Sequence, residues 1–266
     1  MELVDIQKTP DERQVGLDQV GVCDLKYPIV VLDRADGKQQ TIANVALSVS
    51  LAPEVKGTHM SRFISIMNTY RGEITMTAIP NILRDLKSKL EAEAAQVSMT
   101  FPYFIKKTAP VSGHTGYLDC ECTFRGESGP RGEDFHMVVK VNVASLCPCS
   151  KAISDYGAHN QRGEVAMSVE LAEFDGKLAK VWIEELIEVA ESSASAPLYP
   201  LLKRPDERFV TMQAYDNPAF VEDIVRDVAV KLREDKRIAS FEVKVTNFES
   251  IHAHNAFALT RFTRGD

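Results

Sequence analysis

Long apolar runs are missing from this sequence. No stretch approaches the ~18 consecutive apolar residues of a membrane-spanning helix, so we expect no membrane segment. The first residues, MELVDIQKTPDERQ, also lack the basic segment and apolar stretch of a secretory signal. We therefore expect a cytoplasmic protein.

Positive charge is also scarce. The chain has 31 Lys and Arg residues against 38 Asp and Glu residues, for a formal net charge of −7 and a pI of about 5.5. A non-specific nucleic-acid binder needs a basic surface, so we expect no nucleic-acid partner. A local cluster of Lys and Arg could still bind a small anion.

Cysteine is sparse, with five residues in all. The odd number argues against a complete disulfide framework, and a reducing compartment would keep the cysteines as thiols. Cys120 and Cys122 alternate with apolar residues, so they share one face of a predicted strand. We interpret them as core thiols. The alternative is a structural zinc site formed by these two with Cys147 and Cys149.

The chain has enough apolar sequence to bury a core. Of its 266 residues, 44% are hydrophobic and 26% are charged, as in ordinary globular proteins. The length suits two modest domains, or one domain built from two similar halves.

Two halves repeat one plan of secondary structure. In the first half, strand-like alternation or helical spacing predicts strands at Thr41–Ala52 and Arg62–Met67, a helix at Ala78–Ala95, and strands at Gln96–Ile105 and Gly116–Phe124. In the second half, the same criteria predict strands at Phe135–Ala144 and Gly163–Leu171, helices at Leu178–Glu191 and Pro218–Arg237, and strands at Ile238–Phe248 and Ala256–Thr263. The segments Arg125–Asp134 and Leu198–Phe220 are expected to be loops.

This repeated order predicts an α+β fold with antiparallel sheets and helices on one face. We expect an N-terminal extension over residues 1–40, partly flexible, a first module over residues 41–134, and a second over residues 135–266. Such sheets leave unpaired edges. Pairing of these edges between subunits would produce a ring-like assembly.

The densest chemistry lies in SLCPCSKAISDYGAHNQR, at Ser145–Arg162. Cys147 and Cys149 flank a proline directly after a predicted strand, and His159 follows Cys147 by twelve residues. Thiolate and imidazole together suit zinc and similar divalent metals. Either residue alone would more often be structural, but their combination in one polar segment favours a metal site, most of which the second module would carry.

A second polar group follows the predicted strand at Ile238–Phe248. Glu249 is followed by His252 and His254, which are two residues apart and would point the same way in an extended backbone. Such a group could shuttle protons or bind a metal. A role in capping the turn is equally compatible with these residues.

Two further segments carry charge without a decisive pattern. The loop at Leu198–Phe220 contains Lys203 and Glu207, and Glu222 follows at the start of the next helix, where the helix dipole favours a carboxylate. KGTHMSRF combines His59 and Arg62. A solvated loop and a surface turn are the simpler interpretations.

Taken together, Ser145–Arg162, KGTHMSRF, LKRPDER and ESIHAHNAFA resemble the type IB GTP cyclohydrolases, from about Thr41 to Arg264. The resemblance implies the bimodular tunnelling fold and a homotetramer with active sites at subunit interfaces. It also implies conversion of GTP and water to 7,8-dihydroneopterin triphosphate and formate, the first step towards folate. No Walker-type phosphate loop is present, so a P-loop NTPase is not expected.

The same resemblance implies roles for individual residues. Cys147, His159 and Glu207 match the ligands of a divalent metal, which could be zinc, manganese or ferrous iron. Glu222 resembles the carboxylate that anchors the purine. Close catalytic or supporting groups are Cys149, Glu249, His252 and His254, and the substrate-binding candidates also include Lys203, Arg62 and His59. Further cations that could bind the triphosphate are Arg204, Lys151 and Arg162.

Two alternatives remain open at this point. An archaeal-type cyclohydrolase would release a cyclic phosphate product instead of the triphosphate. A non-catalytic binding module would hold its metal only for stability, and chelation would then unfold it.

Overall fold

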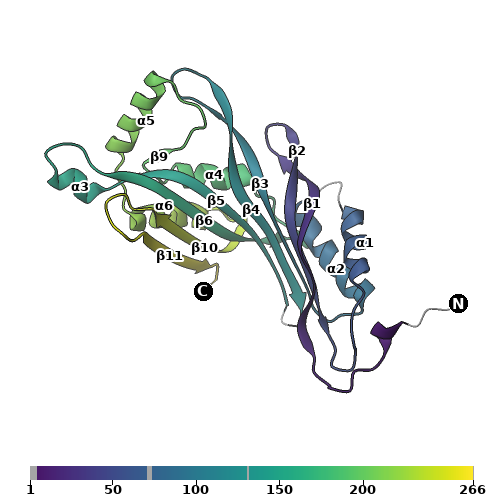
Figure 1. Ribbon diagram of the computed structural model, residues 1–266. Helices are drawn as coiled ribbons and strands as arrows, with labels where there is room; N and C mark the ends of the chain where they lie inside the picture. Colours follow the sequence, from purple (N-terminus) through teal and green to yellow (C-terminus); the bar gives the residue numbers. More distant parts are fainter. Residues whose placement is uncertain (1–4, 71–73, 131, 266) are drawn as a thin grey trace. The chain divides into compact units, whose positions relative to one another are not determined.

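The computed structural model describes residues 5–70, 74–130 and 132–265 (Figure 1). The long strands are β1 (Leu17–Asp33), β2 (Gly37–Leu51), β3 (Ala95–Thr108), β4 (Thr115–Gly129), β5 (Gly132–Leu146), β6 (Asn160–Leu171), β10 (Ile238–Asn247) and β11 (Ala256–Thr263). The short strands are β7 (Glu173–Phe174), β8 (Lys177–Leu178) and β9 (Ala196–Pro197). The helices are α1 (Met60–Tyr70), α2 (Ile79–Leu90), α3 (Pro148–Ile153), α4 (Ile183–Glu191), α5 (Arg204–Asp216) and α6 (Val221–Glu234), with 3-10 turns η1 (Ile6–Lys8) and η2 (Met76–Ala78).

One large sheet holds the long strands in the order β1-β2-β3-β4-β5-β6-β10-β11, and β9 pairs with β5. The pairs β1–β2, β2–β3, β6–β10 and β10–β11 are antiparallel. The predicted α+β class with an antiparallel sheet is confirmed.

The chain forms two compact units that interleave in sequence. The first contains Met1–Phe101 and Thr123–His136, and the second contains Pro102–Cys122 and Met137–Asp266. Strands β3, β4 and β5 therefore contribute residues to both units, whereas the sequence pattern predicted consecutive modules.

In the first unit, α2 confirms the helix predicted at Ala78–Ala95, although it ends at Leu90. Its buried residues follow helical spacing: Ile79, Ile82, Leu83, Leu86 and Leu90. Gly126 of β4 lies close against this face, because a Cβ atom there would be 2.3 Å from Ile79 Cγ2. A glycine is needed for this approach of sheet and helix.

The strand predicted at Arg62–Met67 is wrong, since these residues belong to α1. The buried residues Phe63, Ile66 and Met67 are three and four positions apart, which is the spacing of one helix face. The short apolar run was compatible with either structure.

Strand β1 lies within the predicted N-terminal extension and was missed. It pairs with β2 along most of its length, with register shifts near Leu17 and near Val22. The residues between Leu17 and Lys26 are mostly exposed, so alternation is weak there. The part of the prediction that concerns residues 1–4 falls outside the described residues.

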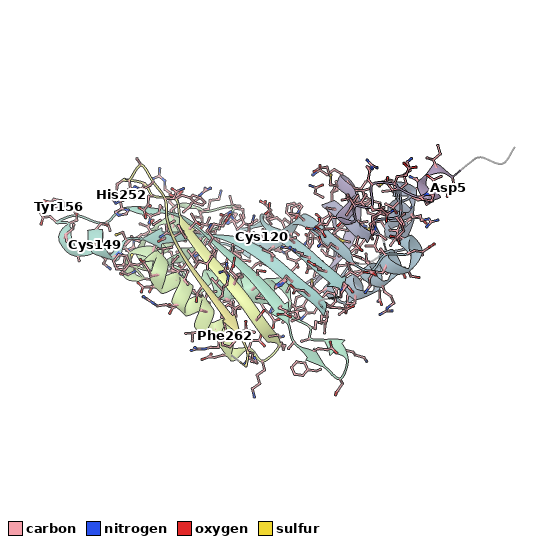
Figure 2. All side chains as sticks on the ribbon, turned by 90° about the horizontal axis from the view of Figure 1, so that it is seen from below. Asp5, Cys120, Cys149, Tyr156, His252 and Phe262 are labelled. Carbon is pink, nitrogen blue, oxygen red and sulfur yellow. The ribbon has the colours of Figure 1, made fainter. Side chains whose placement is uncertain are left out.

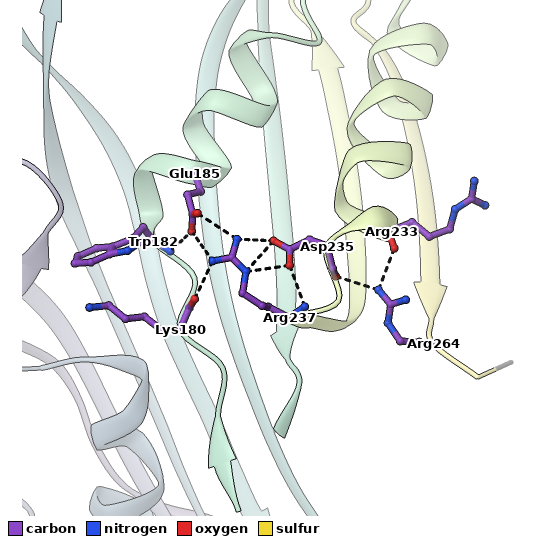
Figure 3. A network of polar contacts seen from close by, with 7 residues as sticks. All are labelled: Lys180, Trp182, Glu185, Arg233, Asp235, Arg237 and Arg264. Carbon is purple, nitrogen blue, oxygen red and sulfur yellow. Dashed lines mark hydrogen bonds and ion pairs between the residues drawn. The ribbon is translucent and has the colours of Figure 1, made fainter. Parts of the chain in front are cut away.

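In the second unit, α4 and α6 carry buried apolar faces. Helix α4 begins at Ile183 rather than at the predicted Leu178, because Glu185 Oε2 accepts the backbone N–H of Trp182 at 2.9 Å. Arg237, after α6, donates to Asp235 Oδ2 at 2.7 Å and to Glu185 Oε1 at 3.1 Å (Figure 3). This network fixes the end of α6 to the start of α4.

The loop predicted at Leu198–Phe220 is also wrong in large part, because it contains the thirteen-residue helix α5. Only Asp206 and Ala214 of α5 are buried, so the sequence has no apolar periodicity to reveal it. Asp206 accepts the backbone N–H of Lys203 at 2.8 Å, which caps the first turn.

Within the described part of the chain, none of the helices has the length and apolar character needed to cross a membrane.

Candidate active site

Three neighbouring strands bring polar residues of the second unit together at one end of the sheet. Cys147 follows β5, His159 precedes β6, and Glu249 lies two residues beyond β10. The backbone N–H of Cys147 donates to His159 O at 3.1 Å, and that of Phe248 donates to Arg162 O at 2.9 Å. Residues more than 80 positions apart in the chain therefore lie close together at these strand ends. Figure 2 shows Cys149 and His252 at the same end.

Cys147 is the N-terminal cap of the short helix α3, which begins at Pro148. Its Sγ accepts the backbone N–H of Ser150 at 3.4 Å, and Pro148 occupies the first turn, where its missing N–H is not needed. Ser150 Oγ accepts the backbone N–H of His159 at 3.1 Å. Ser150 thus joins the two predicted metal ligands.

His159 and Glu249 form the most enclosed pair of this site. Their side chains are 13% and 11% exposed, and His159 Nδ1 lies 4.0 Å from Glu249 Oε2. That oxygen is buried and has no hydrogen-bond partner among the described residues. Because an unpaired buried polar atom is costly, Glu249 Oε2 marks a position suited to a cation or a hydrogen-bond donor.

Gln161 orients the imidazole of His159. Its Oε1 lies 2.9 Å from His159 Nδ1. Since an amide oxygen can only accept, this contact places the proton on Nδ1 and leaves the lone pair of Nε2 available. The arrangement is typical of a histidine that binds a metal through Nε2.

His252 and His254 extend the site along the loop between β10 and β11. Their rings stack at 5.3 Å between centroids with an interplanar angle of 19°, although the backbone there bends and is not the extended segment that the sequence argument assumed. The His252 ring lies edge-on to His159, at 6.4 Å. Both are exposed, whereas His159 is largely enclosed. The geometry provides a row of imidazoles from the interior to solvent.

Glu222 is exposed in the first turn of α6. This turn is held near the end of β5, because the backbone N–H of Ala219 donates to Leu146 O at 3.1 Å. The structure therefore brings the start of α6 to the strand that carries Cys147.

Glu207 and Lys203 lie at the other end of this region, in the first turns of α5, and both are exposed. The C-terminal end of α5 contacts α3, where Lys151 Nζ donates to Tyr215 O and lies 4.1 Å from the centre of its ring. From Glu207 to Tyr215 the helix rises ~12 Å. Within one chain the helix thus carries Glu207 away from the contact with α3, and its metal role stays a prediction.

His59 and Arg62 belong to the first unit, where both line a cavity of about 540 Å³. His59 Nε2 lies 3.2 Å from Asp5 Oδ2, and Arg62 donates to Lys89 O at 2.8 Å. Carboxylates also line this cavity, among them Glu54 and Glu91. Substrate binding by His59 and Arg62 stays a prediction.

All five cysteines are free, as expected. Cys120 and Cys122 are 3% and 0% exposed, so they are core residues as interpreted. Burial raises the pKa of Cys120 to about 12 and that of Cys122 well above its usual value.

The donor chemistry of Cys147 and His159 suits a divalent metal, and the unpartnered oxygen of Glu249 lies 4.0 Å from His159 Nδ1. However, among residues 5–70, 74–130 and 132–265, no three His, Cys, Asp or Glu side chains form a group that could hold a metal ion. The metal role of Cys147 and His159 therefore stays a prediction, and within the described residues no third ligand accompanies them.

Four polar residues that make hydrogen bonds in or next to the candidate site were not singled out in the sequence: Ser145, Ser150, Gln161 and Asn247. Gln161 stands beside His159 in the quoted motif, so its proximity was a usable signal. The strands containing Ser145 and Asn247 offered only a polar residue at the end of an apolar alternation.

Comparison with known proteins then decides the family. Residues 3–258 match the sequence profile described as type I GTP cyclohydrolase folE2. The chain belongs to this family. Among curated relatives, GTP cyclohydrolase FolE2 of Thermosipho melanesiensis is 48% identical over 254 residues, covering 96% of each chain. The enzyme of the same name from Methylobacillus flagellatus is 49% identical over 255 residues, covering 96% of this chain and 94% of the relative.

Solved structures show the fold. The uricase of Arthrobacter globiformis matches 93% of this chain and 94% of its own, with a TM-score of 0.53 and 9% identity. Urate oxidase from Bacillus subtilis 168 matches 92% of this chain and 98% of its own, also with a TM-score of 0.53, at 8% identity. The tunnelling fold predicted from the motif resemblance is confirmed.

Proposed function

We propose that this protein hydrolyses GTP to 7,8-dihydroneopterin triphosphate and formate, in the first step towards folate. The observation that carries the proposal is the meeting of Cys147, His159 and Glu249 at three adjacent strand ends. Membership of the GTP cyclohydrolase family over residues 3–258 supports the substrate. An enzyme with this activity is a hydrolase that acts on the C–N bonds of cyclic amidines.

A divalent metal is part of the proposal, with Cys147 and His159 as ligands. Zinc, manganese and ferrous iron are all compatible with these donors. A divalent metal with an open position would supply a water of lowered pKa for attack on the purine carbon between two nitrogens. Glu207 is the third ligand implied by motif, whereas the position of Glu249 makes it a competing candidate.

Glu222 would bind the guanine edge. This edge presents a ring N–H and an exocyclic amine side by side, which one carboxylate accepts as a bidentate pair. The exposed position of Glu222 at a helix N-terminus keeps its charge available for such a ligand.

The histidines would transfer protons. Opening the imidazole ring of the purine requires a proton at the departing nitrogen, and later steps require proton transfer at the ribose. His252 and His254 are accessible and lie in a row with His159, so they suit this task. Cys149, exposed on α3, is a further group close to the reaction. Lys203, Arg62 and His59 are the proposed contacts to substrate.

A homotetramer with sites at subunit interfaces fits this assignment. One chain supplies no three-residue metal group in its described part, and β1 and β11 end the sheet without further strand partners there. Pairing of subunits would both cover these edges and bring additional cations to the triphosphate. The proposed compartment is the cytoplasm.

Turnover by chelator-treated protein supplied with zinc, manganese or ferrous ions tests the proposal. We expect metal-dependent release of formate and appearance of pterin fluorescence from GTP, with a product that co-migrates with a triphosphate standard. A cyclic phosphate product would favour the archaeal-type reaction. Loss of the fold on chelation, without turnover under any condition, would favour a binding module.

A further inference from the structure

A buried polar chain connects three segments that carry the candidate site. Asn247 Nδ2 donates to Ser145 Oγ at 2.9 Å, and Ser145 Oγ donates to Ala219 O at 3.3 Å. Ser145 is 0% exposed and Asn247 is 3% exposed. Buried hydrogen bonds of this kind fix side chains strongly, because no water can replace a lost partner.

Each member stands close in sequence to a candidate site residue. Ser145 is two residues before Cys147, Asn247 is two before Glu249, and Ala219 is three before Glu222. The linked residues are 102 and 74 positions apart in the chain. The polar chain therefore joins strand β5, strand β10 and the start of α6, two or three residues before the candidate site residues of each segment.

Gly163 makes the bond possible. Strand β6 lies between β5 and β10, and Gly163 is the residue of β6 that pairs with Asn247. Neighbouring strands are ~4.8 Å apart, so Asn247 must reach over one strand to meet Ser145. A Cβ atom at Gly163 would lie 2.8 Å from Asn247 Oδ1 and 3.4 Å from Val143 Cγ2. Only glycine leaves room for the amide.

The direction of the hydrogen bonds is also fixed. Ser145 gives its single proton to a carbonyl, so it can only accept from the amide of Asn247. Asn247 Oδ1 then faces Gly163 and has no hydrogen-bond partner among the described residues. A buried oxygen without a partner costs stability, so the hydrogen bond from Asn247 Nδ2 to Ser145 Oγ is the contact that fixes this amide.

We infer that Asn247 and Ser145 are positioning residues that set the relative placement of Cys147, Glu249 and the start of α6. Gly163 leaves the space that the side chain of Asn247 needs to reach Ser145. The inference rests on the proposed function for its kinetic consequences. Asn247 holds the segments of Glu249 and Cys147, which bear on the chemical step. Ser145 in addition holds the α6 start, which bears on purine binding through Glu222.

The test compares Asn247→Ala, Gly163→Ala and Ser145→Ala. Residues that orient ligands typically contribute 10–100-fold, so we expect kcat to fall by roughly this factor in Asn247→Ala and Gly163→Ala, with KM for GTP little changed. Ser145→Ala should lower kcat and also raise KM, because it alone of the three variants removes the hydrogen bond to Ala219 O. Gly163→Ala removes no polar group. A fall in kcat equal to that of Asn247→Ala would therefore indicate that the loss comes from the hydrogen bond between Asn247 and Ser145.

Ser240→Ala is the matched control. Ser240 also lies on β10 and donates to Glu170 Oε2 at 2.6 Å, but it is at the opposite end of the strand. We expect this variant to keep the wild-type kcat and KM. Equal kinetic losses in Ser240→Ala, or wild-type kinetics in both Asn247→Ala and Gly163→Ala, would overturn the inference.

A readout independent of turnover separates this inference from the proposed function. Cobalt(II) ions added to each chelator-treated variant report on Cys147 through the thiolate-to-cobalt absorption band. We expect the wild type and Ser240→Ala to bind cobalt alike and the other three variants to bind it more weakly. If the wild-type protein binds cobalt but turns over no GTP with any metal, the proposed function fails while the cobalt titration still decides the positioning role. Unchanged cobalt binding in all variants would contradict that role.

Discussion

His159 Nδ1 lies 4.0 Å from Glu249 Oε2, and that oxygen is buried without a hydrogen-bond partner among the described residues. The imidazole proton at Nδ1 is directed to Gln161, so it does not satisfy the carboxylate. A buried carboxylate oxygen in this position needs a cation or a donor from outside the described chain. This relationship links the fold to the proposed chemistry.

The third metal ligand can be identified by paired amide substitutions. If Glu249 is the ligand, Glu249→Gln should lower the metal content of the purified protein, and Glu207→Gln should leave it unchanged. If Glu207 is the ligand, as the motif implies, the order reverses. Metal analysis after gel filtration measures both variants. Full metal content and full activity in both would remove glutamate from the ligand set.

Gln161 is expected to fix the ring orientation and tautomer of His159 without contacting the metal. Gln161→Ala removes the acceptor at Nδ1, which frees the ring to rotate or to adopt the wrong tautomer. Losses for such outer partners are ~10–100-fold in metal affinity or activity. Gln161→Glu keeps an acceptor and should retain most of the affinity. Competition titration with a chromogenic chelator checks the order, and equal affinity in wild type and Gln161→Ala would argue against this role.

The network of Arg237 predicts a pH-dependent stability. A hydrogen bond from Arg237 is the main cause that lowers the pKa of Asp235 below 3.8. A carboxyl with a lowered folded-state pKa stabilises the fold above its unfolded pKa and loses this contribution as pH falls through the folded pKa. Because the partners are partly exposed, Arg237→Ala should lower the free energy of unfolding by only about 1 kcal/mol at neutral pH.

Urea unfolding followed by fluorescence measures this effect, since Trp182 is the only tryptophan and its backbone N–H donates to Glu185 of the same network. The difference between wild type and Arg237→Ala should be constant at about pH 5–7 and should shrink below about pH 4. A difference that grows on acidification would contradict the sign.

The core thiols should be unreactive in the folded protein. With a pKa of about 12, Cys120 is thiolate in only about one molecule in ten thousand at pH 8. Iodoacetamide should therefore modify the exposed Cys149 while Cys120 and Cys122 stay unmodified until urea is added. Peptide mass spectrometry locates the labels. Rapid labelling of Cys122 in native protein would contradict its burial.

Strong periodicity made parts of the fold predictable. Helices α2 and α6 bury residues at regular helical spacing, so their existence followed from the sequence. Helix α5 buries only Asp206 and Ala214, and it is fixed by hydrogen bonds from Val111 and Ser112 to Asp206. These contacts span the chain and leave no local pattern.

The candidate site was likewise predictable from the sequence only in part. Cys147 and His159 lie within one motif and could be recognised together. The bond from Asn247 to Ser145 crosses 102 residues, and it depends on Gly163, whose role appears only when β6 is placed between β5 and β10. Sequence order alone does not contain this adjacency.

Cys147→Ala tests the central claim most directly. The matched control is Cys149→Ala, which removes an exposed neighbouring thiol. Both proteins, freed of metal and supplied with zinc, manganese or ferrous ions, are assayed for bound metal and for formate released from GTP. We predict that Cys147→Ala keeps the wild-type circular dichroism spectrum, binds no metal and releases no formate, while Cys149→Ala still binds metal. A folded Cys147→Ala protein that releases formate from GTP without bound metal would contradict the account.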